Sequence, residues 1–94
     1  MIIVSGWLKV APGERAAYLD GCRVVTEAAR SAPGCRDFHL SADPLEPDRI
    51  NVVERWDSVA DVEAFRGSGP SGEQQGAILD AEVVQYEVVS AQPL

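Results

Sequence analysis

The chain has 94 residues, and its 15 acidic and 8 basic side chains give a formal net charge of −7. This length allows one domain, residues 1–94, and a chain of this size buries only about 60–68% of its unfolded surface, so we expect association to add stability. Clustered Lys and Arg bind nucleic acids and anionic membranes, and the sequence has no basic run, which excludes both as partners.

We do not expect the opening residues to act as a targeting segment. The apolar residues 2–4 have no basic region before them and are followed at once by Ser5, which predicts neither a signal peptide nor a spanning helix. We therefore expect a cytoplasmic protein. Cys22 and Cys35 match neither a zinc nor a CxxC spacing, and His39 is the single histidine, so we expect reduced thiols and no metal site.

Residues 2–10 are predicted to form the first strand. Their apolar side chains occur at both parities, which suggests that both faces of this strand are covered. A turn at Pro12-Gly13 leads into a predicted helix over residues 14–32, within which Gly21 costs about 1 kcal/mol relative to alanine. Pro33-Gly34 ends this helix. Its apolar stripe has helical spacing and consists of Tyr18, Cys22, Val25 and Ala29.

Two predicted strands, residues 35–42 and 49–56, flank a segment rich in Pro and Asp, which favours a hairpin with a turn between them. A second helix over residues 59–66 follows. Ser58 is a suitable N-cap, and Asp61 completes a capping pair while placing negative charge at the positive end of the helix dipole. The predicted apolar stripe of this helix consists of Val59, Val62 and Phe65.

The segment Gly67-Ser68-Gly69-Pro70-Ser71-Gly72 matches the GxGxxG pattern of dinucleotide-binding proteins. That site needs a strand before the glycines and a helix directly after them. Here a helix precedes the glycines, so we interpret this segment as a surface loop that ends the helix. A short helical turn is predicted near residues 74–79, and a final strand over residues 81–89.

The predicted element order is β-α-β-β-α-β, which is the ferredoxin-like α+β arrangement of a four-stranded antiparallel sheet with two helices on one face. The opposite face of the sheet then has no cover. Apolar residues at both parities of the first and last strands predict a large exposed apolar patch on that face of a monomer. A homodimer that packs sheet against sheet would bury this patch.

Glu54, Trp56 and His39 are the residues best suited to carry chemistry. Glu54 shares the parity of Ile50 and Val52, which directs its carboxylate toward apolar surroundings, where it would pair with an arginine or accept a proton. Trp56 ends the same strand, either as a core residue alone or as a core residue that also forms a pocket wall. His39 is either a general base near neutral pH or a solvated bystander on its strand.

The hairpin between two helices in residues 33–65, with Glu54-Arg55-Trp56 at its end, resembles the antibiotic biosynthesis monooxygenase family of dimeric α/β barrels. The resemblance extends through the opening and closing strands to nearly the whole chain. It implies a homodimer and, for some members, oxidation of quinols or anthrones by O2 without a cofactor in a dry aromatic pocket. The haem-degrading branch has an asparagine on the first strand and a histidine on the second helix, and this chain has neither, so no cofactor is expected.

From this resemblance we expect a monooxygenase that acts on a small polyketide-type aromatic compound, with His39, Glu54 and Trp56 as catalytic residues. The residues expected to bind the substrate are Trp7, Phe38, Asn51, Phe65, Arg66 and Tyr86. Two alternatives remain open, an isomerase or lyase of a small carbonyl compound and a non-catalytic accessory protein that binds a small ligand. A register error of one residue would invert the direction of each strand side chain in this set.

Overall fold

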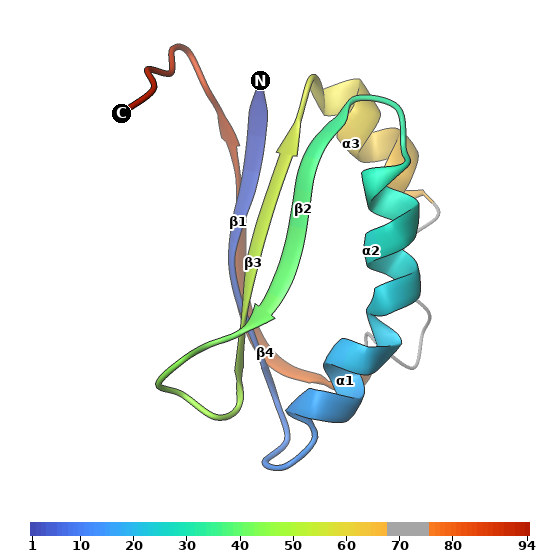
Figure 1. Ribbon diagram of the computed structural model, residues 1–94, viewed down its shortest axis with the longest axis vertical. Coiled ribbons are helices and arrows are strands. Elements are labelled where there is room, and N and C mark those ends of the chain that lie inside the picture. Colours follow the sequence, from blue (N-terminus) through green and yellow to red (C-terminus); the bar gives the residue numbers. More distant parts are fainter. Residues whose placement is uncertain (68–75) are drawn as a thin grey trace.

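The computed structural model of the chain describes residues 1–67 and 76–94. The elements in chain order are β1 (Ile2–Val10), α1 (Arg15–Gly21), α2 (Arg23–Arg30), β2 (Cys35–Ala42), β3 (Arg49–Trp56), α3 (Val59–Arg66) and β4 (Ile78–Glu87). The strands form one four-stranded antiparallel sheet in the order β2-β3-β1-β4. The helices lie on one side of this sheet (Figure 1). This arrangement confirms the predicted ferredoxin-like α+β fold.

The strand register assigns each side chain to one of two faces of the sheet, because directly opposed residues point the same way. Val4 is opposite Glu54, which is opposite Phe38, and all three are buried. We call this helix-covered side the inner face and the other side the outer face. The outer face carries Ile3, Ser5, Trp7, Asp37, His39, Ser41, Asn51, Val53, Arg55, Val84 and Tyr86.

The predicted single helix over residues 14–32 is wrong in one respect, because it is divided into α1 and α2 at Cys22. The Cys22 amide lies 3.1 Å from the carbonyl oxygens of both Tyr18 and Leu19, a shared hydrogen bond typical of helix ends. The glycine just before the division has the weakest helix propensity of the ordinary residues, which locates the break. The predicted inward stripe is confirmed, since Cys22 and Ala29 are buried.

The hairpin strands and α3 begin and end as predicted. Ser58 caps α3, since its hydroxyl oxygen accepts from the Asp61 amide at 3.2 Å and donates to the Asp61 carboxylate at 2.8 Å. In the predicted stripe of α3, Val62 is buried, but Val59 is 41% exposed. The inclusion of Val59 was therefore wrong, because α3 directs only its middle and its end toward the sheet.

The last strand begins at Ile78 and ends at Glu87, earlier at both ends than the predicted range of 81–89. Pairing with β1 sets these bounds, since the ladder extends from Ile2 opposite Glu87 to Val10 opposite Ile78. The predicted turn near residues 74–79 is therefore wrong for its last two residues, which belong to β4. Its first two residues, and the glycine-rich segment after Gly67, lie outside the described residues.

Two hydrophobic clusters make up the core between the sheet and the helices. One consists of Ile2, Val4, Ala29, Phe38, Trp56 and Val62. The other consists of Leu8, Val10, Ile50 and Val52. No helix in the described part of the chain has the length and the apolar run that crossing a membrane requires.

Candidate functional site

A cavity of about 200 Å³ lies between the inner face of the sheet and the helices, and residues from both core clusters line it. We call it the inner chamber. Its aliphatic wall consists of Leu8, Val25, Leu40, Val52, Ile78 and Val83. Its aromatic and polar wall consists of Phe38, Phe65, Tyr18, Cys22, Glu54 and Arg66. Four of the predicted site residues, Phe38, Glu54, Phe65 and Arg66, therefore come together here.

Gly6 lies beside two residues of this chamber. It lies in the middle of β1, opposite Val52 on one side and Val83 on the other, and both of these valines line the chamber. The φ angle of Gly6 is +156°, and a Cβ atom there would collide with the backbone carbonyl of Glu82. The position therefore requires glycine, and β1 places no side chain on the inner face between Val4 and Leu8.

Glu54 is the most buried charged residue of the chamber wall, with 3% of the whole residue exposed. Its Oε1 accepts from Trp56 Nε1 at 3.0 Å and from Arg66 Nη2 at 3.2 Å, and its Oε2 accepts from the same Arg66 nitrogen at 3.1 Å. A buried carboxylate needs such donors to offset the loss of water. Of the two alternatives for Glu54, pairing with an arginine is therefore the one observed, and the partner is Arg66 of α3.

Trp56 packs against two residues of this wall, Glu54 and Phe65. It is fully buried at 0% exposure, and its ring centroid lies 5.3 Å from that of Phe65. Phe65 in turn meets the Phe38 ring edge to face at 5.8 Å. Among the described residues that line the chamber, Tyr18, Phe38 and Phe65 supply the aromatic surface, so Trp56 acts on the chamber through Glu54 and Phe65.

Tyr18 and Cys22 are chamber residues that the sequence reasoning assigned only to the core stripe. Burial and, to a smaller extent, the neighbouring Cys22 thiol raise the pKa of the Tyr18 hydroxyl to about 12. Burial also raises the pKa of the Cys22 thiol, against a smaller opposing effect of its hydrogen bond with Tyr18. Both groups are therefore neutral at pH 7. Helical spacing signalled that they point inward, but it does not separate core residues from cavity walls.

His39 lies on the outer face, on the opposite side of the sheet from Glu54. Its Nε2 is 2.7 Å from Asp37 Oδ1, and its Nδ1 is 3.3 Å from Arg30 Nη2. Because a guanidinium group only donates, Nδ1 must accept, and the ring proton is on Nε2 facing the carboxylate. Burial raises the pKa of Asp37, but its hydrogen bonds with His39 and with the Phe38 amide and the charge of Arg55 outweigh this effect, so the pKa is lowered.

Trp7, Asn51 and Tyr86 also lie on the outer face. The Trp7 ring has Lys9 Nζ and Arg49 Cζ each 5.6 Å from its centroid. Asn51 is held by the β2–β3 turn, since it accepts from Arg49 at 2.8 Å and donates to Asp43 at 2.9 Å. The predicted residues therefore do not form one site: the sheet separates this outer group and His39 from the inner chamber.

In residues 1–67 and 76–94, no group of three or more His, Cys, Asp or Glu side chains is arranged to hold a metal ion. The fold and the chamber together define a small ferredoxin-like α+β protein with a buried carboxylate in an apolar cavity. The model of the antibiotic biosynthesis monooxygenase family matches residues 1–76. The chain therefore belongs to this family of monooxygenases.

Solved structures with the same fold match nearly the whole length of the chain. A Deinococcus radiodurans protein, provisionally assigned as an antibiotic biosynthesis monooxygenase, has a TM-score of 0.81 and 20% identity, covering 100% of this chain and 98% of its own. A Pseudomonas aeruginosa protein has a TM-score of 0.82 and 17% identity, with coverage of 95% and 94%. One from Nitrosomonas europaea, with the same provisional assignment as the first, has a TM-score of 0.80 and 15% identity, with coverage of 96% and 100%. No protein of curated function matches the sequence.

Proposed function

We propose that the protein is a cofactor-independent monooxygenase that oxidises a quinol, an anthrone or a similar polyketide-type aromatic compound with O2 in the inner chamber. The observation that carries this proposal is the carboxylate of Glu54, a buried residue in the wall of a mostly apolar cavity. An apolar chamber suits an aromatic ring, and a carboxylate shielded from water suits proton abstraction. Family membership supports oxygen chemistry.

The proposed reaction begins when Glu54 accepts a proton from the substrate. Neutralising the carboxylate weakens its hold on Arg66, whose guanidinium then pairs with the substrate anion. The electron-rich anion reduces O2 and traps the reduced oxygen at carbon. For an anthrone, the ring CH2 becomes a carbonyl group, one oxygen atom enters the product, and the second leaves as water with the two hydrogens. Trp56 is a positioning residue in this scheme, because it donates to Glu54.

The same carboxylate would serve the enolisation of a small carbonyl compound, and a chamber of about 200 Å³ suits a small molecule. An isomerase or lyase is therefore the second candidate. It needs proton transfer but no O2, so oxygen uptake separates the two. A binding protein without turnover would show stabilisation by a ligand without product.

The test is O2 consumption by the purified, metal-free protein with a panel of quinols and anthrones, corrected for autoxidation. We expect Glu54→Gln to lose activity by about 100-fold or more, because it removes the proton acceptor but keeps the shape. Glu63→Gln, at an exposed position of α3, is the matched control and should retain wild-type activity. His39→Ala should also stay within about twofold of wild type, because His39 lies across the sheet from the chamber.

Two results would count against this assignment. Uptake that survives in Glu54→Gln but disappears in His39→Ala would transfer the base to the outer face. No enzyme-dependent uptake across the panel would remove the monooxygenase and leave the isomerase and binding alternatives. We propose that the working form is a cytoplasmic homodimer joined through the outer face.

A further inference from the structure

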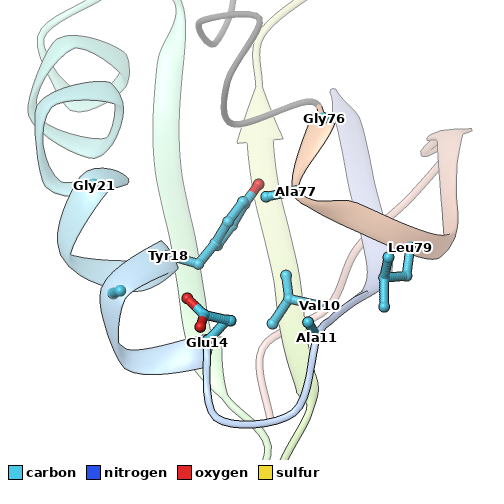
Figure 2. Close-up of a pocket in the computed structure, with 9 residues that line it drawn as sticks. Val10, Ala11, Glu14, Tyr18, Gly21, Gly76, Ala77 and Leu79 are labelled. Atoms are coloured by element: carbon cyan, nitrogen blue, oxygen red, sulfur yellow. The ribbon is translucent and has the colours of Figure 1, made fainter.

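A second hollow of about 420 Å³ lies beside the inner chamber, between α1, the end of β1 and the start of β4 (Figure 2). We call it the α1 groove. Val10, Ala11, Ala17, Ala77 and Leu79 give it a mainly apolar surface. The proposed reaction in the chamber does not use this groove.

Tyr18 connects the groove with the chamber, because it lines both. In Figure 2 its ring extends from α1 across the hollow toward Ala77. The start of β4 also belongs to both, with Ile78 lining the chamber and Leu79, the next residue, lining the groove. One aromatic side chain and one strand end therefore border both spaces.

The volumes suggest that the chamber is one part of a larger site. At about 200 Å³, the chamber is smaller than the roughly 300–1,000 Å³ of typical ligand sites. Chamber and groove together fall within that range. The two hollows also differ in chemistry. The charged pair Glu54–Arg66 lines the chamber but not the groove. Leu79, which is 67% exposed, lines the groove but not the chamber.

We propose that the inner chamber and the α1 groove form one elongated binding site, with Tyr18 as the residue that sets how long a ligand it accepts. The inference rests on the proposed function, which seats the substrate hydroxyl at Glu54. The ligand class is an aromatic molecule with a hydroxyl at one end and an apolar extension at the other, which lies in the groove. The extension carries no negative charge, because the Glu14 carboxylate stands at the groove and would repel it.

The test compares 2-naphthol with 6-phenyl-2-naphthol, which keeps the hydroxyl at one end and adds a ring at the other. Calorimetric titrations under argon measure binding without turnover. We expect wild type to bind the longer probe about tenfold or more tightly, since burying a further ring contributes that much. Ala17→Trp fills the groove from an exposed position of α1 and should remove this advantage while leaving 2-naphthol affinity within about twofold.

Ala16→Trp is the matched control, because Ala16 is exposed on the same helix and does not line the groove. It should bind both probes as wild type does. Tyr18→Trp, which narrows the junction, should also lower affinity for the longer probe more than for the shorter one. An equal effect of Ala17→Trp and Ala16→Trp, or no binding of the longer probe by wild type, would overturn the inference. The proposed function fails differently, when both probes bind but no quinol or anthrone of the panel supports O2 consumption by the protein.

Discussion

The Glu54 carboxylate shows how a single buried charge is held in this small core. Its two oxygens receive three hydrogen-bond contacts from only two side chains, Trp56 and Arg66. The arginine side chain is itself 49% exposed, whereas that of Glu54 is 5% exposed. Removing the arginine would therefore leave a desolvated carboxylate with one donor, while removing the carboxylate leaves a cation that water can reach.

We therefore predict that Arg66→Ala destabilises the protein by about 1–2 kcal/mol, less than a fully buried pair would lose because solvent screens the arginine. In a Glu54→Gln background the same substitution should cost less than about 0.5 kcal/mol, since no buried charge remains unpaired. Urea unfolding of wild type, Arg66→Ala, Glu54→Gln and the double variant measures this coupling. Equal costs in the two backgrounds would show that Arg66 contributes through packing alone.

Among the elements, the β2–β3 hairpin depends on one carboxylate at its turn. Asp43 accepts from the amides of Glu46 at 2.9 Å and Leu45 at 3.0 Å and from Asn51 at 2.9 Å. The hydrogen bond from the Glu46 amide, followed by those from Asn51 and Leu45, lowers the pKa of Asp43 to about 2. Arg15 of α1 braces the turn as well, by donating to the carbonyl oxygens of Asp43, Glu46 and Arg49.

The pH dependence of stability follows from this lowered pKa. Because the folded state holds Asp43 ionised, its contribution is complete above the ordinary pKa of 3.8 and is lost as the pH falls toward about 2. Asp43→Asn should therefore lose less stability than wild type between pH 4 and pH 2, as measured by urea midpoints. Asp20→Asn, on the exposed side of α1, is the control and should follow wild type. Parallel curves for Asp43→Asn and wild type would contradict the prediction.

For the molecule as a whole, the uneven cover of the sheet matters most. All helices lie on the inner side (Figure 1), and apolar side chains remain open on the outer face, with Val53 42%, Val84 41% and Tyr86 50% exposed. A chain of this length gains little stability from its own core, so burial of this apolar patch would strongly favour association. A second copy of the chain is the simplest cover.

We predict an apparent mass near twice 10.1 kDa by light scattering at micromolar concentration. Val84→Lys places a charge on the outer face and should shift the protein to monomer, because an unpaired charge is costly in an interface. Val89→Lys is the matched control, since Val89 follows β4 and is 98% exposed. A wild-type monomer under these conditions would refute the homodimer, and equal effects of the two lysines would remove the outer face as the interface.

Signals that lie within a few residues were enough to predict β2, β3 and α3. The cap of α3 joins Ser58 to Asp61, and Gly34, with a φ angle of +78°, ends the helical segment before β2. Such turns and caps are local, so the sequence by itself determined the boundaries of β2, β3 and α3, the element order and the inward direction of Glu54 within its strand. It also carried enough of the family pattern to identify the fold.

Contacts between distant segments were decided only by the tertiary structure. Pairing with β1 moved the start of β4 to Ile78, and the register that sets Glu54 opposite Phe38 turned His39 to the other face. The division at Cys22 and the choice of Arg66 as the partner of Glu54 depend likewise on how helices meet the sheet. The physical reason is that alternation within a strand is local, whereas register and docking are set by the chain as a whole.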